Sequence, residues 1–146
     1  MSSFLESEKL RQAAFRTASG FFSSPAKADG IYKDKARPFC LPAEHAEENL
    51  FLGIRRTAPA YFSSQGIKWH DGKEGKPSNH LCDSQVCGVN FLFPFADKPQ
   101  ALAHVLRRVY PGIRETLPIE KGQFVACEWI GAENYLRERV PKGGKR

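Results

Sequence analysis

Apolar residues recur at helical spacing in the first half of the chain, with polar residues between them. The first such stretch follows Ser2 or Ser3, either of which can cap a helix, and it ends at Gly20. The second begins at Pro42, because proline is favoured in a first helical turn, and Pro59 should kink or break it. The apolar faces predicted to pack are Phe4, Leu5, Leu10, Ala13, Ala14 and Phe15 in the first helix and Leu50, Phe51, Ile54 and Ala58 in the second.

Two further helices are predicted in the second half of the chain. One runs from about residue 84 to 93, capped by Asp83 or Ser84 and ended by Pro94, since the residue before a proline disfavours helix. The next follows Asp97, a second candidate cap, and has Pro99 in its first turn. Its predicted apolar stripe is Ala101, Leu102, Val105, Leu106 and Val109.

One strand is predicted, from Gln123 to Ile130, because apolar and β-favouring residues run there between turn signals. Glu128 is its exception: an acidic residue on a covered sheet needs a positive partner or a metal, and one at a sheet edge needs neither. Residues 23–38 read as an irregular surface segment, 67–72 as a short strand or extended loop, and 73–78 as a charged turn.

These elements predict an α/β (α+β) fold that is rich in helix, with about four helices packed on a small, incomplete sheet. At 146 residues and 41% hydrophobic content, the chain fits a single domain, 1–146. Within it, residues 1–40 form a helix and an irregular arm, and 41–146 form the main body. No run reaches the roughly 18 apolar residues of a membrane helix, and Glu6 and Glu8 are unlike a signal peptide, so we expect a cytoplasmic protein without membrane association.

The net charge of +6 and the sequence pI of about 9.3 favour an acidic partner such as nucleic acid. The last ten residues concentrate this charge, with a single acidic residue, Glu138, among them. Such a tail can follow a phosphate backbone through charge alone, or it can serve only as a solvated terminus. The candidate nucleic-acid-binding residues are Arg137, Arg139, Lys142, Lys145 and Arg146.

A polar set lies inside the apolar central run, where Val86, Val89, Phe91 and Leu92 predict burial. Buried amides, imidazoles and hydroxyls cost several kcal/mol unless each finds a partner, so the sequence must gain something by placing them there. A substrate pocket and structural pinning of the helix are the two explanations, and both stay open. The candidate network is His80, Ser84, Gln85, Asn90, Glu128 and Glu138.

The four cysteines, Cys40, Cys82, Cys87 and Cys127, are too few and too scattered for a disulfide framework, so we expect reduced thiols. Cys82 and Cys87 are separated by four residues instead of the two usual in zinc knuckles, and with His70 and His80 they form a weak metal hypothesis. A hydrolase with Cys87 or Cys82 as nucleophile and His80 or His70 as base is a further alternative, although no orienting acid is evident.

Five sequence features, taken in order, resemble one bacterial group of restriction-type endonucleases in the PD-(D/E)XK nuclease superfamily. The resemblance runs from about Leu41 to the end of the chain, and it departs from the group at Asp83, where the group usually has a serine. The features are Trp69-His70; Asn79-His80-Leu81; Ser84-Gln85 with Cys87 and Asn90-Phe91-Leu92; Glu128-Trp129-Ile130-Gly131; and Asn134-Tyr135-Leu136.

The resemblance implies a mixed sheet flanked by helices, with an Asp and a Glu-x-Lys triplet on a hairpin that hold Mg²⁺ at the scissile phosphate of DNA. We expect this site to be absent, because no Glu-x-Lys falls on an expected strand and Glu6 and Lys9 are one residue too far apart. We then expect a chain that is truncated before the catalytic hairpin, with no assigned catalytic or metal residue and no cofactor bound by this chain alone, while Mg²⁺ is implied for the complete family enzyme.

Three roles remain after this comparison. The first is a catalytically incomplete relative or fragment of such an endonuclease, acting at most in DNA contact or as a scaffold. The second is a stand-alone, non-enzymatic nucleic-acid-binding or accessory protein, and the third is the Cys/His hydrolase. A homodimer, or a second chain that supplies the missing strands, is expected from an unpaired strand edge.

Overall fold

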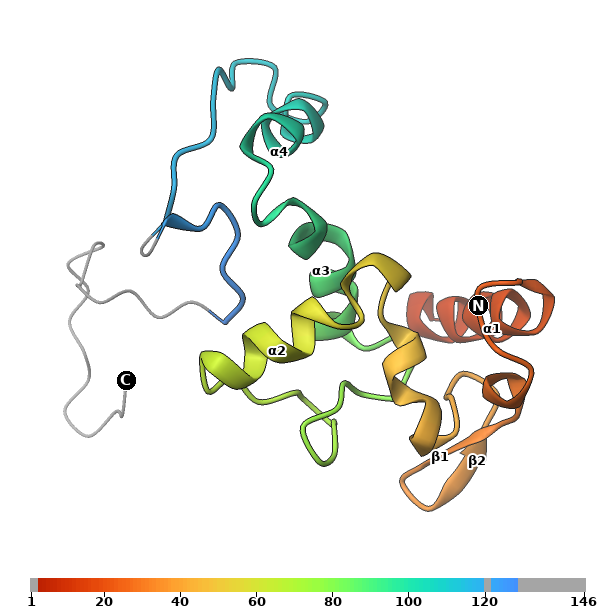
Figure 1. Ribbon diagram of the computed structural model, residues 1–146. Helices are drawn as coiled ribbons and strands as arrows, with labels where there is room; N and C mark the ends of the chain where they lie inside the picture. Colours follow the sequence, from red (N-terminus) through yellow and green to blue (C-terminus); the bar gives the residue numbers. More distant parts are fainter. Residues whose placement is uncertain (1–2, 120–121, 129–146) are drawn as a thin grey trace, which may run out of the picture. The chain divides into compact units, whose positions relative to one another are not determined.

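The computed structural model describes residues 3–119 and 122–128. The chain divides into two compact units, Met1–Pro94 and Phe95–Arg146, and each is described here by itself. Figure 1 shows the helices and the β1–β2 hairpin of the described residues in chain order.

The first helix of the chain, α1 (Phe4–Ala18), begins where the sequence predicts. Ser3 is its cap, and its side chain accepts a hydrogen bond from the amide of Glu6 at 3.4 Å. The predicted packing face is wrong, because Phe4 is 81% exposed and Leu10 is 70% exposed. The buried residue of α1 is Arg16 instead.

An antiparallel hairpin follows the 3₁₀ turn η1 (Pro25–Lys27), and it corrects the prediction of an irregular segment over residues 23–38. Its strands are β1 (Gly30–Tyr32) and β2 (Lys35–Arg37), paired Gly30 to Arg37 and Tyr32 to Lys35. Both residues of the connecting turn have positive φ, 49° and 58°, as a type I′ turn requires. Gly30 has no room for a side chain, since a Cβ there would overlap the backbone carbonyl of Leu41.

The single helix predicted from Pro42 is wrong, because the chain is broken into three shorter elements. They are the 3₁₀ segments η2 (Ala43–Asn49) and η3 (Leu52–Ile54) and the helix α2 (Thr57–Ser64). The break lies before α2, and Pro59 sits in its first turn, where no intrahelical amide bond is lost. The apolar spacing nevertheless identified the core of this unit, since Leu50, Ile54 and Ala58 are buried; Phe51 is exposed.

The segment between α2 and α3 contains no strand, so residues 67–72 adopt the extended loop that was one of their two predicted states. Its Trp69 is buried and stacks on Phe62, with ring centroids 3.8 Å apart. Farther along, Asn79 and Leu81 bond to the backbone of residues 39–41 at 2.9 and 3.0 Å. These bonds hold the loop against the foot of the hairpin.

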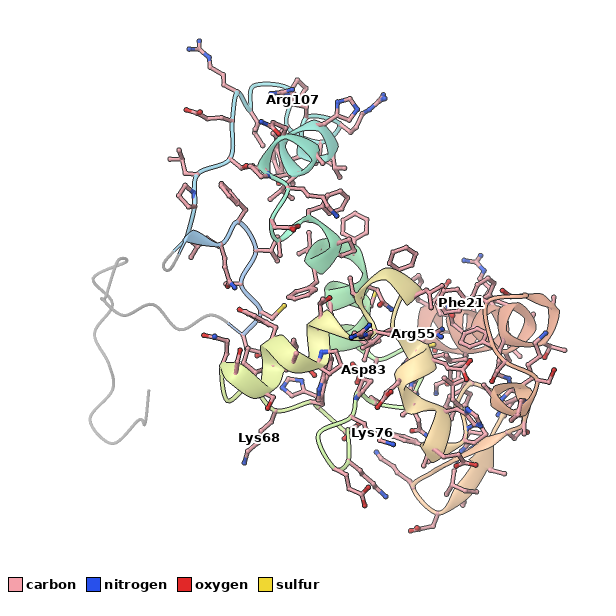
Figure 2. The ribbon with its side chains drawn as sticks, in the orientation of Figure 1. Phe21, Arg55, Lys68, Lys76, Asp83 and Arg107 are labelled. Atoms are coloured by element: carbon pink, nitrogen blue, oxygen red, sulfur yellow. The ribbon has the colours of Figure 1, made fainter. Side chains whose placement is uncertain are left out.

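Helix α3 (Ser84–Leu92) confirms the prediction for the central run. Asp83, labelled in Figure 2, is its cap. A carboxylate oxygen of Asp83 accepts a hydrogen bond from the amide of Val86 at 2.8 Å. A 3₁₀ turn, η4 (Phe93–Phe95), follows at the expected proline, Pro94.

Replacing the cap tests this assignment. We expect Asp83→Ala to lower the free energy of unfolding by about 1 kcal/mol, because one amide of the first turn loses its acceptor. Asp83→Asn, which keeps an acceptor, should lose much less, and Ser84→Ala, at an exposed neighbouring position, is the matched control. Urea titration followed by circular dichroism measures the three variants, and equal losses in all of them would contradict the capping role.

In the second unit, helix α4 (Pro99–Leu106) also confirms its prediction, with Pro99 as the first residue. The cap residue is Lys98 and not Asp97, and it makes no side-chain capping bond. The helix stops at Leu106, so the predicted stripe is cut short: Leu102 is buried, whereas Val109 is exposed.

The strand predicted from Gln123 is wrong over the described residues 122–128, which form turns and irregular backbone. Three backbone bonds position this segment: the amide of Phe124 donates to Ala96, the amide of Ile119 to Gln123, and the amide of Gly122 to Ile119. Glu128, the exception within the predicted strand, has a φ of 49°, outside the β region. Strand propensity depends on a neighbouring strand to pair with, and none lies beside this run in the described residues.

The fold class is therefore a helix-rich α+β fold with a small sheet, as predicted. Among the described residues, no helix has the length and apolar content needed to cross a bilayer.

Candidate functional site

Gln85, in the first turn of α3, is buried and uses both ends of its amide on the backbone of one loop. Its Oε1 accepts a hydrogen bond from the amide of His70 at 2.8 Å, and its Nε2 donates to the carbonyl of Lys68 at 3.1 Å. These two bonds replace the water that the loop backbone loses on burial. The structure thus gives Gln85 a structural task, holding the loop that carries Trp69 against α3.

Asn90, one turn and a half farther along α3, does the same for a second segment. Its Oδ1 accepts from the amide of Phe51 at 2.7 Å, and its Nδ2 donates to the carbonyl of Asn49 at 2.8 Å. The buried side chain of Asn49 in turn donates to the carbonyls of Ser78 and His80 at 2.8 and 3.1 Å. Three segments are joined in this way. Asn49 was not among the residues predicted from the sequence, where its signal was an amide directly before the apolar face that begins at Leu50.

His80 lies half-buried between two aromatic rings, those of Tyr32 and Phe39, with centroids 5.0 and 4.9 Å away. Its Nδ1 accepts a hydrogen bond from the amide of Cys82 at 3.0 Å, which requires a ring without a proton at that nitrogen. Burial lowers the pKa of His80 below its ordinary value of 6.5, and the positive charge of Lys9 lowers it further against the opposing effect of Asp83. The imidazole is therefore neutral at physiological pH.

This neutrality makes the stability of the first unit depend on pH. The unfolded chain takes up a proton at His80 below about pH 6.5, and the folded chain does so only at lower pH, so stability should fall as the pH drops from about 7.5 to about 5. In His80→Asn, whose Oδ1 takes the place of Nδ1, this fall should be smaller. Urea midpoints at the two pH values measure it, with His104→Gln as the control variant. An equal fall of the urea midpoint between the two pH values in wild type and in His80→Asn would contradict the assignment of His80 as a buried, neutral imidazole.

The other members of the predicted network are Ser84, Glu128 and Glu138. Ser84 is exposed at the start of α3, and Glu128 is exposed in the second unit. Glu138 and the five basic candidates, Arg137, Arg139, Lys142, Lys145 and Arg146, lie outside the described residues. Of the predicted set, the structure brings together His80, Gln85 and Asn90, through the backbone segments that they hold.

A cavity of about 320 Å³ opens beside this framework, between β1, η2 and the loop of residues 71–79. The hydroxyl of Tyr32 donates to the carboxylate of Asp71 at 3.0 Å near its rim. Charges of both signs line it, from Glu44, Asp71, Lys73, Glu74 and Lys76, the last of which is labelled in Figure 2.

Two residues of this lining belong to a Glu-x-Lys triplet, Glu74-Gly75-Lys76. The prediction that the catalytic Mg²⁺ site is absent considered only triplets on an expected strand, and this one lies in a predicted turn. Glu74 and Gly75 have φ values of 53° and 75°, so this backbone is not a strand. Asp71 precedes the triplet by only three residues. The pattern is present, but not on the hairpin that the resemblance implies.

The described residues contain no group of side chains that could hold a metal ion. Nowhere in residues 3–119 and 122–128 do three or more His, Cys, Asp or Glu side chains come together in a group that could hold one. This covers the carboxylates of the cavity and the histidines and cysteines around α3. No chemical step through Mg²⁺ or zinc is derived from this part of the chain.

The thiols near His80 are poorly suited to nucleophilic attack. Burial raises the pKa of Cys40 to about 11, and it also raises the pKa of Cys82. A nucleophilic cysteine needs the opposite change, because the thiolate is the reactive form. Cys87 is exposed on α3. The geometry around His80 therefore favours a structural role over the Cys/His hydrolase.

Comparison with known proteins gives one result. A family model described as "Restriction Endonuclease associating with ARP" matches residues 8–146. No curated protein and no solved structure matches the chain. The family match begins well before Leu41, where the predicted resemblance starts, so it includes most of α1 and the whole β-hairpin. Because the match covers nearly the full sequence, the chain belongs to this restriction-endonuclease family.

Proposed function

We propose that this chain, as a member of its restriction-endonuclease family, binds duplex DNA. We also propose that it does not cut DNA without a further chain or segment. The family match is the observation that carries the proposal, since a restriction endonuclease acts on DNA. The finer assignment to the PD-(D/E)XK superfamily belongs to the same proposal and rests on the motif order described above.

The charge of the chain supports the binding half of the proposal. Residues 95–146 contain ten lysines and arginines against six acidic residues, and five of those cations fall within the last ten positions. Cations that neutralise phosphates release the counterions condensed on DNA, which gives affinity without sequence recognition. The basic tail and the second unit thus supply the charge that such binding needs.

The proposal that this chain does not cut DNA by itself rests on the catalytic pattern of the superfamily. Its carboxylates hold Mg²⁺ from a hairpin, whereas Glu74-Gly75-Lys76 occupies a turn and has Asp71 almost adjacent. A complete enzyme of this type needs Mg²⁺, and the carboxylates that bind it would then come from another chain or from elsewhere in this one.

A binding titration at two salt concentrations tests the first half. Anisotropy of a labelled duplex should report affinity that falls at least tenfold between about 50 mM and about 200 mM salt, as expected for several neutralised phosphates. An affinity that is absent, or that does not respond to salt, overturns DNA binding through charge.

A cleavage assay with supercoiled plasmid and Mg²⁺ tests the second half, and we expect no nicking. The decisive variants are Glu74→Gln and Lys76→Ala, with Glu47→Gln, at an exposed position on η2, as the matched control. Nicking by the wild type that persists in the control and is lost in both cavity variants would overturn the proposal and identify Glu74-Gly75-Lys76 as part of a working site.

A further inference from the structure

The hairpin of β1 and β2 carries a net positive charge. Three of its eight residues, Lys33, Lys35 and Arg37, are cationic, against one acid, Asp34. Lys33 and Lys35 are exposed at the tip, and Figure 1 shows the hairpin at the periphery of its unit. None of the three cations forms a salt bridge with a carboxylate in the described part of the chain. Their charge is therefore not neutralised by the protein.

The register of the hairpin places Lys35 and Arg37 on one face, whereas Lys33 lies in the turn. Tyr32 pairs with Lys35, and Gly30 pairs with Arg37, and paired side chains of an antiparallel ladder point to the same side. Lys35 and Arg37 consequently share the face of Tyr32. Ile31 and Ala36 form the opposite face.

Aromatic rings pack on this same face of the hairpin. The ring of Tyr32 contacts His80 edge-on, and His80 contacts Phe39, as described for the site. Lys33 lies over the ring of Tyr32 at 5.3 Å, and Arg37 lies over Phe39 at 6.0 Å. A cation held over a ring loses less conformational freedom on binding an anion than one on a free side chain.

The foot of the hairpin is held just as firmly. The amide of Gly30 donates to the carbonyl of Cys40 at 3.0 Å, and Asn79 donates to the carbonyl of Leu41 at 2.7 Å. Lys9 of α1 lies over the ring of Phe39 at 4.9 Å, as Arg37 does, and it also forms an ion pair with Glu6 at 2.7 Å. The tip is thus presented on a fixed base.

We propose that the tip and basic face of this hairpin bind the phosphate backbone of duplex DNA, through Lys33, Lys35 and Arg37. The proposal rests on the DNA binding proposed above and adds where in the first unit the contact is made. Charge complementarity commits it to a polyanion, and the family commits it to DNA. A two-stranded ribbon is also an element that the major groove admits, so the tip can reach phosphates on both sides of it.

The test compares two variants of the full chain that lose the same charge. Lys33→Asn with Lys35→Gln removes the two tip cations, and asparagine tolerates the positive φ of residue 33. Lys68→Gln with Arg56→Gln is the control, because both residues are exposed in the first unit and neither belongs to the hairpin. Lys35→Gln alone is a second variant, which leaves the turn untouched. Equal thermal midpoints show that each variant is folded.

Affinity for a labelled duplex is then measured over a series of salt concentrations. The tip variant should bind about tenfold more weakly or worse near 100 mM salt, and the slope of log K against log salt should become shallower by about 2, one per lost phosphate contact. The single variant should show about half of that change in slope, and the control should keep the wild-type slope.

The remaining outcomes separate the two proposals. A wild type that binds DNA, with tip and control variants weakened alike, overturns the hairpin contact and leaves the proposed function standing. A wild type without salt-dependent DNA binding overturns both. Binding of the wild type to duplex RNA but not to duplex DNA overturns the identity of the partner.

Discussion

Phe62→Ala should lower the free energy of unfolding by about 4 kcal/mol, as expected for a large aromatic removed from a core. Phe62 is 1% exposed on α2, and its ring stacks on that of Trp69 at an interplanar angle of 10°. The substitution removes the buried area, leaves a cavity and loses a ring pair worth about 1 kcal/mol beyond its area. Because Trp69 is carried by the loop that Gln85 holds, that loop should loosen as well.

Urea unfolding followed by tryptophan fluorescence measures this loss and reports on Trp69 at the same time. Phe91→Ala is the matched control: the same residue type on a helix, but 64% exposed, so its cost should stay within about 0.5 kcal/mol. Similar losses in the two variants would show that Phe62 does not lie in the core.

The starts of α1, α3 and α4 could be predicted because their signals are local, whereas the helix predicted from Pro42 is wrong. Each of these signals acts within the first turn of its helix. In the structure Ser3 caps α1, Asp83 caps α3 and Pro99 is the first residue of α4. Which face of a helix is buried depends on partners far away in the sequence. The apolar stripe of α1 therefore predicted a core contact for Leu10 that the structure does not make.

The strands could not be predicted in the same way, because a strand also depends on a partner elsewhere in the chain. Composition favoured a strand from Gln123, which finds no neighbour to pair with in the described residues. The actual hairpin has only three residues in each strand, and its signal was a turn, Lys33-Asp34, without the usual glycine. A strand is decided by its pairing, and pairing was not readable from either run alone.

For the candidate site, the sequence indicated which polar residues are under constraint but not why. Gln85 and Asn90 were identified as costly to bury, and the structure shows each satisfying backbone groups of a distant segment. Such partners are 15 to 41 residues away in the chain. No periodicity encodes that distance, so function and architecture could not be separated at the level of the sequence.

Arg16 is the residue that sequence reasoning overlooked altogether, because an arginine in the last turn of a helix suits the helix dipole and needs no other explanation. It is only 4% exposed. Its Nη1 donates to the carbonyls of Ala28 and Cys40 at 2.8 and 2.9 Å, and its Nη2 donates to Asp29 at 2.7 Å. A single guanidinium thus joins α1 to both ends of the hairpin segment.

Arg16→Met should therefore cost about 3 kcal/mol of unfolding free energy, although methionine fills much of the same volume. The carbonyl of Ala28 loses the guanidinium donor, the carbonyl of Cys40 keeps only the amide of Gly30, and Asp29 loses its partner. Arg16→Lys keeps the charge but not the planar fork, so it should recover only part of that loss. Arg11→Met, which breaks the exposed pair with Glu8, should cost less than about 0.5 kcal/mol. Urea titration of the three variants measures the difference. A cost for Arg16→Met no larger than that for Arg11→Met would mean that α1 is held to the hairpin by something other than this side chain.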